Sequence, residues 1–118
     1  MKNIEAFYPL SPMQQGMFFH SLDVSESGAY LQQISCVLRG RLDVQAFEKA
    51  WQQVVKRHPV LRTSFIWEGV KETVQVVQRH ADISLEQQDW EALAPFRRED
   101  SLEELLAADR QRGFDLSK

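Results

Sequence analysis

Few residues of this chain have the types and spacing that chemistry requires. The three histidines, His20, His58 and His80, fall on separate predicted elements and match no metal-ligand spacing. Cys36 lies in a predicted strand, and a single cysteine forms neither an internal disulfide framework nor a cysteine-rich zinc site. The carboxylates are scattered, and the chain has no glycine-rich phosphate loop, no Gly-x-Ser-x-Gly elbow and no His-Glu-x-x-His. The residues alone therefore predict no catalytic constellation and no metal site.

Composition narrows the class of protein. With 118 residues, 43% hydrophobic and 26% charged, the chain has the make-up of one globular domain rather than of a disordered segment. Its net charge of −3 is no footprint for nucleic acid or an anionic membrane. No apolar run approaches the length of a transmembrane helix, and the first residues lack the apolar core of a secretory signal. We expect a soluble cytoplasmic protein.

The first third of the chain contains one clear helix start. Residues 1–10 read as an extended lead-in. Ser11 and Gln14 form a capping box, with proline at the first helical position, which predicts a helix over residues 12–22. Residues 30–38 are rich in strand-forming residues in imperfect alternation, which predicts a strand.

The middle of the chain predicts a second helix and a hairpin. Asp43 is placed to cap a helix over residues 44–58, whose apolar residues recur with helical spacing, and Pro59 ends it. Residues 61–67 and 72–78 read as a β-hairpin.

The last third predicts one more helix. Residues 83–87 are a candidate short strand, and residues 89–98 are expected to be irregular. Ser101 and Glu104 form a second capping box that opens a helix ending near Arg112, with Gly113 as its C-cap. The order α-β-α-β-β-(β)-α predicts an α/β (α+β) sandwich with a mostly antiparallel or mixed sheet.

Two segments resemble a known family. Residues 8–22, Tyr-Pro-Leu-Ser-Pro-Met-Gln-Gln-Gly-Met-Phe-Phe-His-Ser-Leu, are similar to the first core motif of the condensation domains of non-ribosomal peptide synthetases. Residues 57–65, Arg-His-Pro-Val-Leu-Arg-Thr-Ser-Phe, resemble their second core motif, Arg-His-x-x-Leu-Arg-Thr-x-Phe. Residues 112–117 resemble the stretch that leads into the family's next strand. The resemblance covers essentially the whole chain.

The resemblance implies a fold and a reaction. Condensation domains resemble chloramphenicol acetyltransferase, with two lobes flanking a tunnel. Carrier proteins bring thioester-bound groups to the tunnel on phosphopantetheine arms, and the acceptor amine attacks the donor thioester to form a peptide bond. This chain would then be a partial lobe that binds no cofactor itself. Its partners would be peptidyl or acyl carrier proteins and the remainder of the domain.

The family's catalytic motif, His-His-x-x-x-Asp-Gly, is not found in the sequence, which contains no His-His pair. In family order this motif lies beyond residues 112–117. The resemblance therefore implies that residues 1–118 are the N-terminal segment of a condensation domain, truncated before that motif. We expect the chain alone to be inactive, because amide formation needs a positioned amine, a route for its proton and a stabilised oxyanion. An unfinished sheet would also leave strand edges that invite association.

The resemblance suggests candidate site residues, each with a plainer alternative. The helix over residues 12–22 would lie near the tunnel, which makes its wall candidates Met13, Gln14, Met17 and His20. The alternative is that the methionines, with Phe18, are core. The wording of residues 16–20 resembles the subclass that takes a D-configured donor.

Arg62 and His58 are assigned structural roles. Arg62 interrupts an apolar strand pattern, so burial would require a carboxylate partner, for which we expect an acidic residue outside this chain. A solvent-facing strand position is the alternative.

Other functions of the same fold remain open. One is a non-catalytic module that docks or recruits carrier proteins. Another is a fragment of an epimerisation domain, although the wording of the first motif favours condensation. The residues that follow Lys118 in the parent gene would discriminate among the three.

Overall fold

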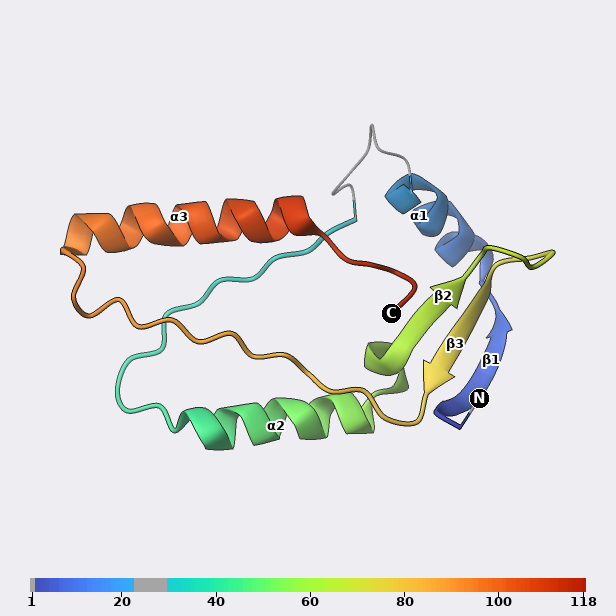
Figure 1. The fold of residues 1–118 in the computed structure, drawn as a ribbon, viewed down its shortest axis with the longest axis horizontal. Helices are drawn as coiled ribbons and strands as arrows, with labels where there is room; N and C mark the ends of the chain where they lie inside the picture. Colours follow the sequence, from blue (N-terminus) through green and yellow to red (C-terminus); the bar gives the residue numbers. More distant parts are fainter. Residues whose placement is uncertain (1, 23–29) are drawn as a thin grey trace. The chain divides into compact units, whose positions relative to one another are not determined.

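The structure is a computed structural model that describes residues 2–22 and 30–118. The described elements follow the order β1 (Ile4–Pro9), α1 (Pro12–Leu22), α2 (Val44–Arg57), the 3₁₀ helix η2 (Pro59–Arg62), β2 (Thr63–Ile66), β3 (Val74–Gln78) and α3 (Pro95–Arg112) (Figure 1). Within the described residues, no helix has the length and apolar character needed to cross a membrane.

The chain divides into two compact units. One comprises Met1–Gln15, Cys36–Leu85 and Asp115–Lys118, and the other comprises Gly16–Ser35 and Glu86–Phe114. The first holds the sheet, the start of α1 and the whole of α2. The second holds the rest of α1 and α3.

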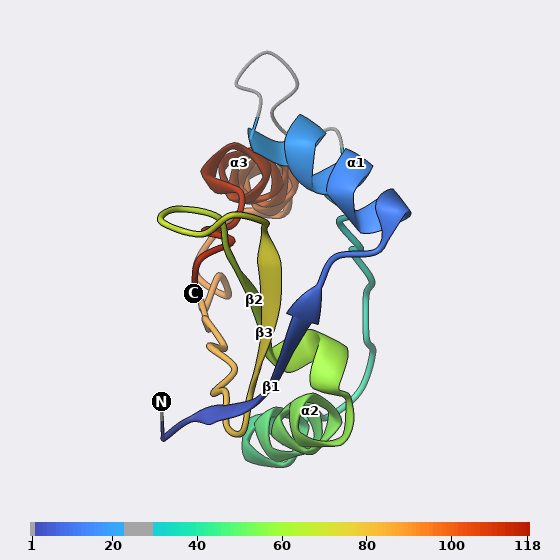
Figure 2. The same cartoon turned by 90° about the vertical axis from the view of Figure 1, so that its right-hand side faces the viewer.

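The sheet of the first unit has three antiparallel strands in the order β1-β3-β2 (Figure 2). β2 and β3 form the predicted hairpin, in which Ser64 lies opposite Val76. The prediction of a hairpin is confirmed, although residues 61 and 62 belong to η2 rather than to a strand. The buried side chains among the described residues all belong to the first unit, in the strands or in the segments next to them: Leu10, Val55, Arg62, Ser64, Val76 and Val77.

The N-terminal lead-in is a strand, which the sequence did not predict. β1 pairs with β3 from Ile4 opposite Gln78 to Pro9 opposite Val74. The register shifts between Ile4 and Ala6, so Glu5 is the extra residue of a β-bulge.

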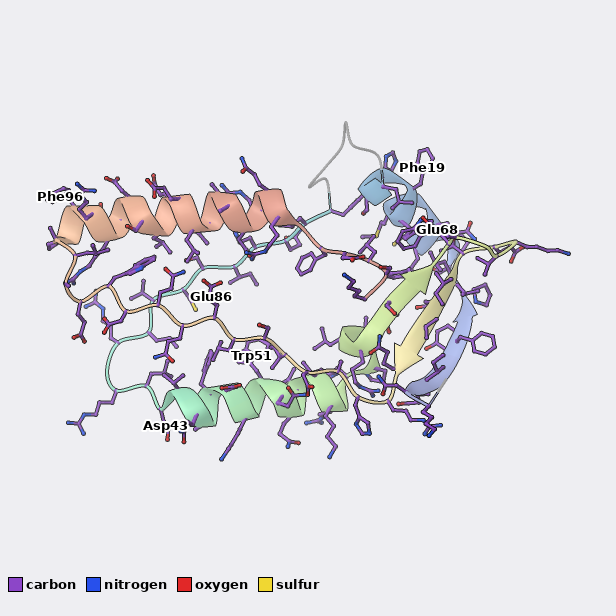
Figure 3. All side chains as sticks on the ribbon, in the orientation of Figure 1. Phe19, Asp43, Trp51, Glu68, Glu86 and Phe96 are labelled. Carbon is purple, nitrogen blue, oxygen red and sulfur yellow. The ribbon has the colours of Figure 1, made fainter. Side chains whose placement is uncertain are left out.

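The caps of the first two helices match the sequence. The Gln14 amide donates to the Ser11 hydroxyl at 3.2 Å, and the Ser11 amide donates to the Gln14 side chain at 2.9 Å, which is a complete capping box. Asp43 caps α2 by accepting from the amide of Ala46 at 3.0 Å. Figure 3 shows Asp43 at the start of that helix.

Two predicted strands do not form. Residues 30–38 and 83–87 are described by the structure and belong to no strand. Hydrogen bonds that involve single side chains hold both segments instead. Gln33 donates to the Leu106 carbonyl on α3 at 3.0 Å, and the Ile83 amide donates to the Gln52 side chain on α2 at 3.0 Å. The observed order therefore differs from the predicted one, while the mixed helix-and-sheet class agrees.

The predicted start of the last helix is wrong. α3 begins at Pro95, and Ser101 lies inside it rather than capping it. Proline at the first helical position supplies a preset backbone angle and needs no partner for a missing amide, so the helix starts there. Its end was predicted correctly: Gly113 has a φ of 58° and donates to the Asp109 carbonyl at 3.2 Å.

Candidate functional site

Gln14, a tunnel-wall candidate, is held against the sheet by a pair of side-chain amides. Gln14 donates to the Oε1 of Gln75 at 3.2 Å, and Gln75 donates to the Oε1 of Gln14 at 3.1 Å. Gln75 also donates to the Pro9 carbonyl at 3.2 Å. Each amide therefore both donates and accepts, so this pair fixes the start of α1 relative to β1 and β3.

The two methionines of α1 face outward. Met13 is 77% exposed and Met17 is 40% exposed, and no residue of α1 is buried. The alternative in which both are core residues does not fit these exposures. Their role at a tunnel wall stays a prediction.

His20, the fourth candidate, is half-buried against aromatic rings. Its ring centre lies 5.7 Å from that of Phe19 in an edge-on arrangement and 6.0 Å from that of Tyr30. Aromatic rings at these distances contact one another, so the His20 ring is positioned by its two neighbours.

Arg62 is the most densely bonded side chain in the described structure, and it is only 7% exposed. Its guanidinium donates to the Glu5 carboxylate at 2.9 Å. It also donates to four backbone carbonyls, those of Val55, Lys56, Gln78 and Arg79. One cation therefore ties the end of α2 to β1 and to the end of β3.

This arrangement corrects the expectation for Arg62. Its carboxylate partner lies within the chain, at Glu5, and the solvent-facing alternative is wrong because the side chain is buried. The bulge in β1 aims Glu5 at the guanidinium, since an extra residue in a strand redirects its side chain. The planar guanidinium suits such a site because its five donors spread in a fixed fork.

His58 occupies the C-cap of α2 and is exposed. Its backbone amide donates to the Val54 carbonyl at 3.0 Å, and its carbonyl accepts from the amide of Leu61 at 3.0 Å. These bonds join α2 to η2, so its backbone serves the connection. No group of three or more His, Cys, Asp or Glu residues is placed to hold a metal within residues 2–22 and 30–118.

The second unit contains a pocket of about 410 Å³. Apolar side chains of Trp90 and α3 line it together with polar ones; the lining residues are Glu86, Gln88, Trp90, Leu102, Leu105, Leu106 and Asp109. Asp109 is engaged by Arg112 and by Gln33. The pocket lining is mainly apolar and includes two carboxylates, those of Glu86 and Asp109. None of the four tunnel-wall candidates on α1 lines this pocket.

The last residues carry one shifted carboxyl group. The hydroxyl of Ser117 donates to Asp115 at 2.5 Å and its backbone amide donates at 3.0 Å. These bonds, with Lys118 at 3.1 Å, lower the pKa of Asp115 to about 2. The neighbouring Leu116 carbonyl accepts from the amide of Phe65 at 2.8 Å, so this segment lies beside β2.

Comparison with known protein families identifies the family of this chain. The sequence model described as "Condensation domain" matches residues 4–118. The chain belongs to the condensation domain family.

Individual relatives include subunits of linear gramicidin synthase and mycosubtilin synthase. The chain is 50% identical over 116 residues to a linear gramicidin synthase subunit of Brevibacillus parabrevis, covering 98% of this chain and 2% of that protein. It is 41% identical over 113 residues to a mycosubtilin synthase subunit of Bacillus subtilis, covering 96% of this chain and 4% of that protein. The chain therefore spans a small fraction of the curated relatives it matches.

The partners of Arg62 and Gln14 could not be predicted from the sequence. Glu5 looked like part of a loose lead-in, and Gln75 looked like an ordinary polar position of a strand. The periodicity of residues 4–9 is weak because the bulge interrupts their alternation. The aromatic residues Phe7 and Tyr8, which follow Ile4 and Ala6, were the available signal for a strand.

Proposed function

We propose that this chain is a segment of a condensation domain that forms peptide bonds between a carrier-bound thioester donor and a carrier-bound amine acceptor. The observation that carries the proposal is the family match over residues 4–118. The phosphopantetheine arms would belong to the partner carrier proteins, and the work would take place in the cytoplasm. The segment corresponds to the front of the N-terminal lobe.

A second part of the proposal is that further residues of the domain complete this lobe. Ile34 is 91% exposed and Val37 is 81% exposed on a segment with the composition of a strand but no strand neighbour among the described residues. Soluble domains rarely leave a run of large apolar side chains uncovered. A sheet from the rest of the domain would cover them and would turn this segment into a strand.

The third part is that the chain is inactive alone. Its three histidines lie on separate parts of the described structure: His20 beside Phe19 and Tyr30, His58 at the C-cap of α2, and His80 next to Asn3. By the family resemblance, the reacting histidine belongs to the His-His-x-x-x-Asp-Gly motif. What this segment contributes is the wall and the frame, with Met13, Gln14, Met17 and His20 as wall candidates.

Fragment complementation tests the proposal. Donor and acceptor carrier thioesters are incubated with the chain alone, and then with the chain plus the part of the linear gramicidin synthase condensation domain that follows the matched segment. We expect no dipeptidyl thioester from either polypeptide alone and product from the mixture. Product from the chain alone would contradict its inactivity. A stable complex of the two polypeptides without product would favour the non-catalytic docking module.

A further inference from the structure

Three backbone segments meet at one corner of the first unit. The guanidinium of Arg62 binds the carbonyls at the end of α2 and at the end of β3. Asn3 adds the start of β1, since its side chain donates to the His80 carbonyl at 3.0 Å and accepts from the His80 amide at 3.1 Å. Figures 1 and 2 show these three chain segments side by side.

The corner carries a concentration of positive charge, which we call the basic corner. It is formed by exposed residues from the three segments: Lys2, Lys56, Arg57, His58, Arg79 and His80. Four of them are full cations in a chain whose net charge is −3. Among the described residues, the side chains of these four cations make no ion pair, so their charges are available to a partner.

Negative charge near the basic corner is limited. The Glu5 carboxylate is taken by Arg62, which is itself buried and does not contribute to the surface. Asp82 is the exposed acidic residue that follows His80 along the chain. Basic residues at a helix C-terminus are usually explained by the helix dipole, which accounts for Lys56 and Arg57 but not for Arg79.

The backbone beneath these charges is preorganised. The carbonyls of Lys56 and Arg79 are both bound by one guanidinium, and the Arg79 amide donates to the Asn3 carbonyl at 2.6 Å. A surface whose backbone is already fixed loses less entropy on binding than a mobile loop does. Positive charge on such a frame favours both the rate and the specificity of association with an acidic surface.

We propose that the basic corner is a docking surface for an acidic face of a carrier protein. The identity of the partner rests on the proposed function, whereas the preference for an acidic protein rests on the charges described above. Four cations are too small a footprint for nucleic acid in a chain with net negative charge. The separate positions of the cations on three elements suit a broad carboxylate-bearing surface rather than one phosphate group.

Charge reversal with a matched control tests the proposal. The probe is a fluorescently labelled acidic carrier domain from the linear gramicidin synthase relative, and the readout is anisotropy with the full chain. The test variant combines Arg57→Glu with Arg79→Glu, whose side chains make no hydrogen bond in the described structure. The control variant combines Arg39→Glu with Arg41→Glu, which are exposed and precede α2. The two pairs thus flank a helix of 14 residues, or about 21 Å at the usual rise.

Both variants have the same net charge, so a non-specific charge effect would weaken them equally. We expect the Kd of the test variant to rise about tenfold and that of the control to change less than about twofold, since only the test variant replaces attraction by repulsion at the basic corner. Raising the salt concentration should weaken the unmodified chain and should remove the difference between the variants. Circular dichroism confirms that both variants fold.

Several results would overturn the proposal. They are equal weakening of the two variants, affinity that is independent of salt, and absence of binding by the unmodified chain at low salt. Displacement of the carrier domain by inorganic phosphate, but not by chloride at equal ionic strength, would show that the basic corner binds phosphate groups rather than a carboxylate-bearing protein surface. Because the assay measures binding without turnover, its outcome is separate from that of the complementation assay.

Discussion

Replacing Arg62 gives the sharpest prediction about how this segment holds together. Arg62→Met keeps much of the aliphatic stem and removes all five donors. The variant would leave four backbone carbonyls without the guanidinium and would free the Glu5 carboxylate. Glu5→Gln is the paired variant, because it removes the ion pair and leaves the carbonyl bonds in place.

The magnitudes differ because the two partners differ in exposure. Arg62 is 7% exposed, and its bond to the Val55 carbonyl is buried, so losing it and its companions should lower the free energy of unfolding by about 3 kcal/mol. Glu5 is 46% exposed, so solvent screens its pair with Arg62, and a glutamine at position 5 still offers an amide oxygen to the guanidinium; Glu5→Gln should therefore cost less than about 1 kcal/mol. Arg62→Lys should lie between the two, because an ammonium cannot span the carbonyls that the guanidinium fork reaches.

Urea titration followed by circular dichroism measures all three variants under the same conditions. With an m value of about 1–2 kcal/mol/M, the midpoint should fall by about 1.5–3 M for Arg62→Met and by less than about 1 M for Glu5→Gln. If Arg62→Met does not fold, Arg62→Lys still provides the graded comparison. Equal losses for Glu5→Gln and Arg62→Met would show that the ion pair, rather than the binding of carbonyls, dominates, and would refute the reasoning.

Four further substitutions test other contacts. Gln75→Glu should lower the free energy of unfolding by about 1–3 kcal/mol, because it replaces the two hydrogen bonds that Gln75 donates by repulsion between oxygens. Gln14→Glu should cost less than about 1 kcal/mol in the same urea titration, because the new side chain still accepts from the Ser11 amide. Equal costs would contradict the described donor directions. Asp43→Ala should cost about 1 kcal/mol by loss of the α2 cap, and an unchanged midpoint would count against that cap. Carboxyl NMR should find a pKa of about 2 for Asp115. The stabilisation from its hydrogen bonds is therefore fully present at pH values above its ordinary pKa of 3.8 and is lost as the pH falls through about 2. In Ser117→Ala the pKa of Asp115 should rise toward 3.8, and an unchanged pKa would show that the Ser117 hydroxyl is not the cause.

Local chemistry made the helices and the hairpin predictable. The capping box at Ser11 and the cap at Asp43 depend on residues three positions apart, so the sequence contains both partners. The apolar period of α2 and the valine-rich composition of β3 act in the same way. The start of α3 was missed because Pro95 and Ser101 are both acceptable starts, and the choice depends on the helix as a whole.

Long-range partners were not predictable from one sequence. Glu5 reaches Arg62 only because a bulge in β1 changes the direction of its side chain, and no local pattern encodes that bulge. Gln75 meets Gln14 only when the start of α1 lies against β3. Residues 30–38 had the composition of a strand, yet a strand also needs a neighbour, which composition does not supply. The resemblance of two ordered motifs, rather than the physics of single residues, pointed to the family that the comparison then showed.

A chimera tests the central claim most directly. The matched 116-residue segment of the linear gramicidin synthase relative is replaced by this chain, and peptide-bond formation is measured by single-turnover transfer between its carrier domains. We predict a folded chimera that forms the same peptide-bond product as the parent, because the segment would supply the frame and, by the family resemblance, the His-His-x-x-x-Asp-Gly motif would lie in the part that the parent keeps. A chimera that folds and loads both carriers but forms no peptide bond, while the parent does, would contradict the account.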